Sequence, residues 1–346
     1  MKFKKLGHTN IDVSLICLGT MNMGEQNSQE ESFEQMDYSY DQGVNFFDTA
    51  EVYAVPPREE TQGKTEEIIG NWFIKSKKRE KIILATKMVG PGPQWIRNGG
   101  GDFTEKNMSI AIDGSLKRLQ TDYIDLYQLH WPERNTNYFG KRNYTHDPKE
   151  DKWNDLESVL KGLKKFVDQG KIRYIGISNE TPWGFAKFLE ISNALKLPRI
   201  VSVQNPYNLL NRAYDIAMSE ISCREKVGLL AYSPLALGYL SGKYRNNQMP
   251  KKSRIGLYGH FWTRYKEDNA KKAVEDYYNL AKENGLTLAQ MTLAFINSRP
   301  FMTSNIIGAT TMEQLKENIG SIDIELSHEI VDKINLIHAN NPNPTP

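Results

Sequence analysis

Cysteine is scarce in this 346-residue sequence, which has two, Cys17 and Cys223, too few for a disulfide framework. Cys17 lies in the apolar run VSLICLGT and suits a buried small side chain, which fits a reducing compartment. Long apolar stretches are also missing, since none approaches the ~20 residues that a membrane-spanning helix requires. No apolar segment follows the basic N-terminus as it would in a secretory signal. We therefore expect a soluble, cytoplasmic protein.

An excess of charge of one sign is absent as well. The 44 Lys and Arg residues nearly balance the 42 Asp and Glu residues, so the net charge is +2. A nucleic-acid-binding protein needs a basic face or stripe. The densest basic cluster, KSKKREK at residues 75–81, is better explained as a solvated helix end. We expect no nucleic-acid partner.

The sequence does contain eight short apolar runs rich in Val, Ile, Leu, Phe and Tyr. Several of them lack polar alternation, which is typical of parallel strands covered by helices. The predicted strands are 13–20, 44–50, 81–87, 123–131, 172–179, 200–207, 227–234 and 305–310.

Helical patterns separate these runs. Strand followed by helix, repeated eight times, predicts an α/β fold of the (β/α)₈ TIM-barrel type, formed by residues 1–346 as a single domain. The alternative is an open doubly wound sheet, which usually carries a glycine fingerprint, but no GxGxxG motif occurs here. The predicted helices are 32–43, 65–80, 104–120, 155–170, 181–195, 213–224 and 269–285.

Four connections are longer than a simple turn requires, namely 54–64, 88–103, 132–152 and 236–268. Each follows a predicted strand, so in a barrel all four emerge at the C-terminal face, where active sites lie. We expect these extended loops to build the site. The tail at 340–346 is predicted to be frayed or draped over the surface.

Polar side chains end three consecutive strands. Asp48 and Tyr53 follow the second apolar run in VNFFDTAEVY, Lys87 ends the third, and His130 ends the fourth. An ammonium stabilises a neighbouring phenolate and lowers its pKa, and an imidazole donates a hydrogen bond to the oxygen that the phenol approaches. Such a group polarises and protonates a carbonyl oxygen. No nucleophile or metal-ligand set accompanies it, so the hydride would come from a cofactor.

Taken one at a time, these residues have ordinary structural explanations. Asp48 suits a cap, Lys87 a solvated side chain, His130 a loop histidine and Tyr53 a packing residue. Their shared position at the ends of consecutive strands favours the functional interpretation.

The motifs DTAEVY, ATK and DLYQLHWP resemble those of the aldo-keto reductases, and the likeness extends from LGTMNMG to GATTMEQLKENI. It is strongest to a bacterial branch with segments like EVYAVPP and ETQG. The resemblance implies a (β/α)₈ barrel with a catalytic tetrad of Asp48, Tyr53, Lys87 and His130, in which the tyrosine is the general acid.

The same resemblance implies a nicotinamide cofactor site in the second half of the chain. It places Ser178, Asn179 and Gln204 at the carboxamide and Tyr232 against the nicotinamide ring. The diphosphate would lie along AYSPLALGYLSGKY. The remaining cofactor-binding residues that it implies there are Ser233, Pro234, Leu235, Gly238 and Lys243.

The segment GATTMEQLKENI is expected to begin a helix, with Thr310 and Glu313 forming a capping box. A helix N-terminus also attracts phosphate. The resemblance implies that this helix and Arg254 bind the adenosine 2′-phosphate and adenine of NADPH. The residues involved in the helix would be Gly308, Thr310, Gln314, Glu317 and Asn318. Many family members have a basic residue where Gln314 stands, which weakens the preference for NADPH over NADH.

We therefore expect an NADPH-dependent oxidoreductase that reduces aldehydes or ketones. Aromatic loop residues predict an apolar-walled substrate pocket, with Met21 and Asn22 widening its mouth or making it more polar. These aromatics are Trp95, Trp131, Tyr138, Phe139 and Tyr144.

Two alternatives remain open. The segments GISN, SPLALG and GATTMEQL also resemble potassium-channel β subunits, which implies a nicotinamide-binding sensor or scaffold with slow turnover. A barrel with unrelated chemistry, such as an isomerase or lyase, would bind no dinucleotide.

Overall fold

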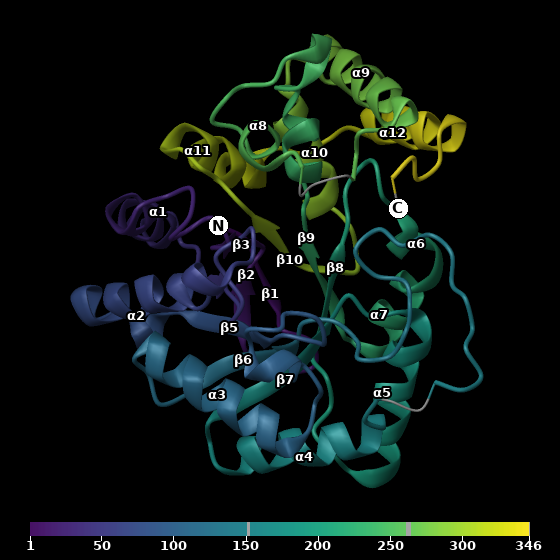
Figure 1. Cartoon of the computed structure of the whole chain (residues 1–346). Helices are drawn as coiled ribbons and strands as arrows, with labels where there is room; N and C mark the ends of the chain where they lie inside the picture. Colours follow the sequence, from purple (N-terminus) through teal and green to yellow (C-terminus); the bar gives the residue numbers. More distant parts are fainter. Residues whose placement is uncertain (151–152, 261–263, 346) are drawn as a thin grey trace.

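A barrel of parallel strands forms the centre of the protein in the computed structural model, which describes residues 1–150, 153–260 and 264–345. Within these residues eight strands close the barrel in the order β10-β3-β4-β5-β6-β7-β8-β9, and helices surround it (Figure 1). This confirms the predicted (β/α)₈ barrel. The barrel strands are β3 (Ile16–Gly19), β4 (Phe46–Asp48), β5 (Ile83–Met88), β6 (Ile124–Leu129), β7 (Ile172–Ser178), β8 (Ser202–Pro206), β9 (Gly228–Tyr232) and β10 (Met302–Ile307).

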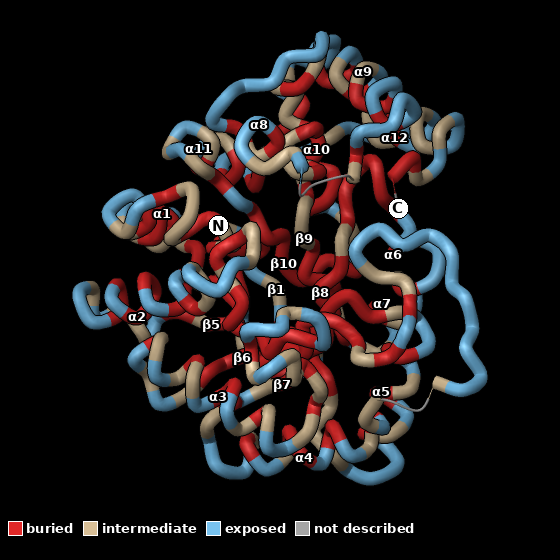
Figure 2. Tube along the Cα trace, viewed as in Figure 1, coloured by how far each residue is buried: buried red, intermediate tan, exposed pale blue. Residues whose placement is uncertain are grey.

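A short antiparallel hairpin precedes the barrel, and the sequence did not predict it: the single strand predicted at 13–20 covers both the end of the hairpin and barrel strand β3. Its strands, β1 (Phe3–Lys5) and β2 (Asp12–Ser14), carry too few residues for a clear alternating pattern. Leu6 and Val13 from the hairpin are fully buried and pack with Cys17 and Phe46 inside the barrel. The hairpin thus seals the barrel end that lies opposite the strand C-termini. Figure 2 shows this buried centre.

Helices cover the outside of the barrel. Capping fixes several of their ends: the Thr104 side chain accepts a hydrogen bond from Asn107 N, and Gly43 follows its helix with φ +83°, as predicted for a C-terminal stop. The helices are α1 (Gln29–Asp41), α2 (Lys64–Ser76), α3 (Glu105–Leu119), α4 (Leu156–Asp168), α5 (Pro182–Leu195), α6 (Ala213–Ala217), α7 (Ser219–Glu225), α8 (Arg254–Tyr258), α9 (Asp268–Glu283), α10 (Leu288–Asn297), α11 (Met312–Gly320) and α12 (His328–Asn340).

Some element boundaries differ from the prediction. The helix predicted at 213–224 is two helices, α6 and α7, which meet at Met218. Strand β10 begins at Met302, three residues before the predicted 305–310. The capping box of Thr310 and Glu313 is wrong, because the cap of α11 is Thr311, whose side chain accepts from Gln314 N. No described helix is long and apolar enough to cross a membrane.

The long loops and the tail lie close to where the sequence places them. The loops follow β4, β5, β6 and β9 in a parallel barrel and therefore share its C-terminal face. Parts of two of them, 151–152 and 261–263, lie outside the described residues. The tail is draped rather than frayed as far as residue 345: Arg212 N donates to Asn343 Oδ1 at 2.6 Å, and Thr345 N donates to Leu210 O at 3.2 Å. Both cysteines are free, Cys17 buried and Cys223 exposed.

Candidate active site

A buried ion pair lies at the C-terminal ends of β4 and β5. Lys87 Nζ is 2.6 Å from Asp48 Oδ2 and donates a second hydrogen bond to Thr49 O at 2.7 Å. The Lys87 side chain is fully buried and Asp48 nearly so. Parallel pairing places Asp48 opposite Ala85, so that these two strands deliver both charges to one rim. The lysine is therefore fixed in position and in charge.

Two glutamines support the second carboxylate oxygen. Gln204 Nε2 donates to Asp48 Oδ1 at 2.8 Å, and Gln128 Nε2 donates to the same oxygen at 3.2 Å. Sequence analysis assigned Gln204 to a cofactor and missed Gln128. A polar residue within the buried strand IDLYQL was the signal that pointed to it. Every oxygen of this buried carboxylate thus has a partner, as a buried charge requires.

Tyr53 and His130 complete the cluster. Lys87 Nζ lies 5.0 Å from the centroid of the Tyr53 ring. The rings of Tyr53 and His130 are 5.7 Å apart between centroids and meet edge to face, with 77° between their planes. The structure therefore brings together all four residues that the sequence singled out, as a phenol and an imidazole beside a buried ion pair.

Burial decides the protonation of these groups. Burial lowers the pKa of Lys87, but the charge of Asp48 and the neighbouring Tyr53 raise that pKa above its usual value overall. Burial raises the pKa of Tyr53, and the charge of Lys87 lowers that pKa as expected but by less, so the net shift is upward. Burial, followed by the charge of Lys87, holds the pKa of His130 well below its usual value. Tyrosine is thus a protonated donor at neutral pH, and His130 is a neutral imidazole.

The loop that carries Tyr53 is anchored by a second buried ion pair, which the sequence analysis did not identify. Arg97 Nη1 and Nη2 lie 2.7 and 2.8 Å from the two oxygens of Glu51. Glu51 also accepts from Val89 N at 2.7 Å, and its own backbone N–H donates to Lys87 O at 3.2 Å. These contacts tie the β4 loop to the β5 loop, two residues from the phenol.

A cavity of about 840 Å³ opens at this rim, within the range of small-molecule sites. Residues from all four long loops line it. Of the residues that the sequence singled out for catalysis or cofactor binding, Lys87 lies behind the wall. The others line the cavity: Asp48, Tyr53, His130, Ser178, Asn179, Gln204, Tyr232, Ser233, Pro234, Leu235, Gly238, Lys243, Arg254, Gly308, Thr310, Gln314, Glu317 and Asn318.

The model of the aldo/keto reductase family matches residues 15–339. Protein tas of Escherichia coli (strain K12) is 45% identical over 100% of both chains. The chain belongs to the aldo/keto reductase family. The uncharacterized oxidoreductase YrpG of Bacillus subtilis (strain 168) is 33% identical over 100% of this chain and 98% of that protein. A probable voltage-gated potassium channel subunit beta of Oryza sativa subsp. japonica is 30% identical over 100% of this chain and 99% of that protein. The predicted family and its bacterial tas-like branch are confirmed.

Aldo/keto reductases generally use nicotinamide cofactors, and the cations of this cavity suit a polyanionic ligand. Arg254 is half-buried and hydrogen-bonded through Nη2 to Asn22 Oδ1. Burial lowers the pKa of Arg254 to about 10. Burial and then the charge of Arg254 lower the pKa of Lys243. A Cβ at Gly238 would lie 2.6 Å from Lys243 Cε, so glycine leaves room for this lysine. Crowded, desolvated cations fit the phosphates of such a cofactor.

The polar groups expected at the nicotinamide form a connected network. Tyr232 OH donates to Asn179 Oδ1 at 2.6 Å, and Asn179 Nδ2 donates to His130 O at 2.9 Å. Ser178 Oγ donates to Gln204 O at 2.8 Å. These bonds link β7, β8 and β9 to the end of β6. Tyr232 and His130 are therefore held in a fixed relation to each other.

The end of the cavity at α11 is polar but already partly hydrogen-bonded within the protein. Gln314 Oε1 accepts from Thr310 N at 3.1 Å. Glu317 Oε1 accepts from Thr287 Oγ1 at 2.6 Å, and Asn318 is buried. Gln314 therefore holds the turn before α11 in addition to facing the cavity.

The aromatic residues expected around the substrate divide into two groups. Trp131 and Phe139 line the cavity, with their ring centroids 5.4 Å apart. Trp95, Tyr138 and Tyr144 are not among its lining residues. Met21 and Asn22 both line it, and Asn22 Nδ2 also donates to Ala309 O at 3.4 Å. Two of the five aromatic residues that the sequence suggested, Trp131 and Phe139, therefore form part of the cavity wall.

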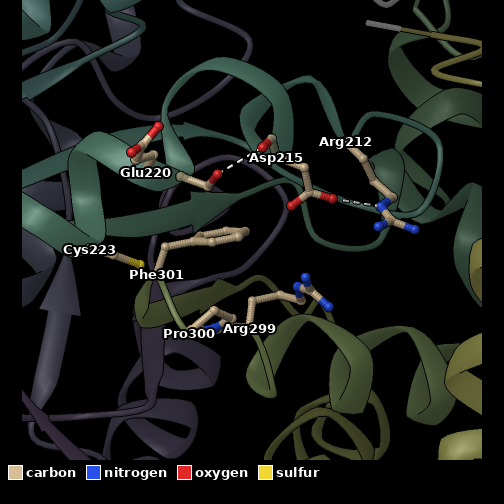
Figure 3. A pocket seen from close by; sticks show the side chains of 8 residues that line it. Arg212, Asp215, Glu220, Cys223, Arg299, Pro300 and Phe301 are labelled. Atoms are coloured by element: carbon tan, nitrogen blue, oxygen red, sulfur yellow. Dashed lines mark hydrogen bonds and ion pairs between the residues drawn. The ribbon is translucent and has the colours of Figure 1, made fainter.

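A smaller cavity of about 320 Å³ lies outside the barrel, between α6–α7 and residues Arg299–Phe301 (Figure 3). Its acid Asp215 is 2.8 Å from Arg212 Nε and also accepts from Tyr207 OH at 2.9 Å. Arg212, Tyr207 and Asp215 thus hydrogen-bond to one another, and these three groups form no arrangement comparable to the tetrad. Among the residues that the structure describes, no group of three or more His, Cys, Asp or Glu could hold a metal ion.

Proposed function

We propose that this aldo/keto reductase reduces aldehydes or ketones to alcohols with NADPH, and that residues 1–346 act as one domain in the cytoplasm. The observation that carries the proposal is the Asp48–Lys87 ion pair, 2.6 Å long and buried, beside Tyr53 at the rim of a large cavity. A bound nicotinamide supplies the hydride that reduces the carbonyl carbon.

The residues of this chain would supply the proton and orient the carbonyl. Tyr53 is protonated at neutral pH because burial raises its pKa, and it would donate its proton to the carbonyl oxygen. Lys87 stabilises the phenolate that remains, and Asp48 keeps Lys87 charged and in place. His130, a neutral imidazole because burial lowers its pKa, would donate a hydrogen bond to the same oxygen.

The cofactor would lie between Tyr53 and α11. We propose that Ser178, Asn179 and Gln204 bind the carboxamide and that Tyr232 packs against the nicotinamide ring. Lys243 and Arg254 would bind phosphates, as their crowding in the cavity favours an anion there.

The first test is consumption of NADPH by the purified chain with a panel of small aldehydes and ketones, together with fluorescence titrations of NADPH and NADH. We expect turnover with some carbonyl compounds and tighter binding of NADPH, because Arg254 would favour the additional 2′-phosphate. Equal titration curves for the two cofactors would contradict the NADPH preference. Failure to bind either cofactor would contradict the whole proposal.

NADPH affinity should fall as the pH rises through the lowered pKa of Lys243. The pKa of Lys243 is lowered by burial and by Arg254, whereas a bound phosphate would raise it, so binding takes up a proton between the two values. Affinity is then constant below the lowered pKa and declines as pH rises toward ~10.4, the ordinary lysine value. The Lys243→Met variant should bind NADPH roughly tenfold more weakly and show a flatter pH profile. A profile with the wild-type slope would contradict the role of Lys243.

A second candidate function is a nicotinamide-binding sensor or scaffold. It is favoured by the 30% identity, over the whole chain, to the rice protein named a probable potassium channel subunit beta. Light scattering with and without NADPH distinguishes it from the enzyme. Cofactor-dependent assembly with negligible turnover would favour the scaffold, whereas turnover without assembly would favour the enzyme.

A further inference from the structure

Arg264 lines the cavity but lies apart from the cations assigned to phosphate. It comes from the residues before α9, whereas Arg254 begins α8 and Lys243 lies eleven residues before it. The guanidinium carbon of Arg264 lies 5.9 Å from the centroid of the Tyr265 ring, and the phenol of Tyr232 is a further neighbour. Among the described residues, 1–150, 153–260 and 264–345, no Asp or Glu forms an ion pair with Arg264. No described carboxylate therefore neutralises its charge at the cavity wall.

The position of Arg264 is fixed by its neighbours. Tyr265 is buried, and its hydroxyl accepts a hydrogen bond from Asn208 Nδ2 at 3.1 Å. On the other side lies Gly140 of the β6 loop, where a Cβ would come within 3.0 Å of Arg264 Nε. The guanidinium is therefore held between the β6 and β9 loops.

This guanidinium lies at the catalytic end of the cavity. It lies close enough to Tyr232 for its charge to oppose the burial that raises the pKa of that phenol. The Tyr232 hydroxyl donates to Asn179 Oδ1 at 2.6 Å, and Asn179 in turn donates to His130 O at 2.9 Å. The charge that lowers the pKa of Lys243, by contrast, is that of Arg254. The cavity thus has cations on more than one side. Arg254 interacts electrostatically with both Lys243 and Tyr53, whereas Arg264 lies beside Tyr232 and Gly140.

The wall beside the tetrad is otherwise apolar. It is lined by Val52, Val55, Trp131 and Phe139, with Pro57 and Pro93 from the neighbouring loops. A substrate with an apolar body would pack against these side chains. An anionic group on a substrate that packs against Phe139 would meet the guanidinium of Arg264, whose planar pair of N–H donors matches a carboxylate. A phosphate dianion would require further donors, so the arrangement favours a carboxylate.

We propose, building on the proposed reductase function, that Arg264 binds a carboxylate of the carbonyl substrate and that the preferred substrates are aldehydes or ketones carrying a carboxylate. Arg264 would determine which substrates bind well, whereas the tetrad would transfer the proton without it. Uncharged carbonyl compounds would react as well, at lower kcat/KM.

The test compares substrates that differ in the carboxylate alone. The pairs are 4-carboxybenzaldehyde with 4-methylbenzaldehyde, and succinic semialdehyde with butanal. For the wild-type chain we expect kcat/KM for the carboxylate member to exceed that for its partner by roughly tenfold or more, mainly through KM. In Arg264→Gln this ratio should fall to near one. Arg264→Lys should restore part of this ratio, because an ammonium supplies the positive charge but lacks the paired N–H donors of a guanidinium.

Arg142→Gln is the matched control. It removes a cation from the same pair of loops, but Arg142 does not line the cavity. Its substrate ratio should equal that of the wild-type chain. A wild-type ratio at or below one would overturn the inference, as would a ratio unchanged in Arg264→Gln or lost equally in Arg142→Gln.

A binding measurement without cofactor separates this inference from the proposed reductase function. Quenching of protein fluorescence, to which Trp131 in the cavity contributes, reports binding of 4-methylbenzoate and 4-methylbenzyl alcohol. We expect tighter binding of the benzoate by the wild-type chain and loss of this preference in Arg264→Gln. The same preference in both chains would overturn the role of Arg264. If the chain prefers the benzoate through Arg264 but oxidises no NADPH, the reductase function is refuted and the role of Arg264 in carboxylate binding stands.

Discussion

Replacing Tyr53 by phenylalanine is expected to lower kcat for carbonyl reduction by roughly 100- to 10,000-fold, the contribution typical of a general acid. The substitution removes the hydroxyl, which would donate the proton, and keeps the ring. That ring packs edge to face on His130 with centroids 5.7 Å apart and lies 5.0 Å from Lys87 Nζ. The fold and the cavity should therefore be preserved.

The measurement is NADPH oxidation followed by absorbance, with NADPH affinity determined separately by fluorescence. Affinity should change little, so that the loss appears in kcat. Tyr138→Phe serves as the control, because Tyr138 lies in the neighbouring β6 loop but does not line the cavity. Near wild-type turnover in Tyr53→Phe, or an equal loss in Tyr138→Phe, would show that another group donates the proton.

The tetrad was predictable from the sequence because parallel strands restrict where their ends can lie. Once the apolar runs around Phe47, Ala85 and Leu126 are aligned as neighbouring strands, Asp48, Lys87 and His130 must share a rim. The registers observed in the barrel pair these strands directly. The clustering follows from topology and needs no knowledge of side-chain packing.

Other features depend on packing and were not predictable. Glu51 and Arg97 are 46 residues apart, and nothing in either segment shows that they meet. The sign of the pKa shift of Tyr53 depends on whether burial outweighs the charge of Lys87, and only the structure shows that it does. Nine of the ten residues of α10 are buried, so its sequence lacks the continuous polar face by which a helix is recognised.

The buried ion pair gives the second large expected effect, on stability. Replacing Lys87 by methionine leaves the Asp48 carboxylate in a buried site with hydrogen bonds from Gln128 and Gln204 but no counter-charge. Breaking a buried pair in this way typically costs about 3–5 kcal/mol in the free energy of unfolding. Urea unfolding at pH 7.5, followed by circular dichroism, measures the loss. Turnover should be lost as well.

The loss in Lys87→Met should depend on pH in a defined direction. Without its counter-charge, the carboxylate of Asp48 would have a folded-state pKa above the ordinary unfolded value of ~3.9. Above that value the unfolded state releases the proton more readily than the folded state, so the variant becomes less stable as pH rises. The difference between variant and wild type should therefore be smaller at pH 4.5 than at pH 7.5.

The double variant Lys87→Met/Asp48→Asn tests whether charge is the cause. Asparagine is nearly isosteric with aspartate, and its side-chain oxygen can still accept from Gln204, which lies 2.8 Å from the carboxylate in the native protein. Neither buried charge remains, so the double variant should be more stable than Lys87→Met and also than Asp48→Asn, which leaves the ammonium of Lys87 unpaired. Additive losses from the two single variants would mean that the ion pair contributes no coupling, and that the effect of each substitution arises from packing.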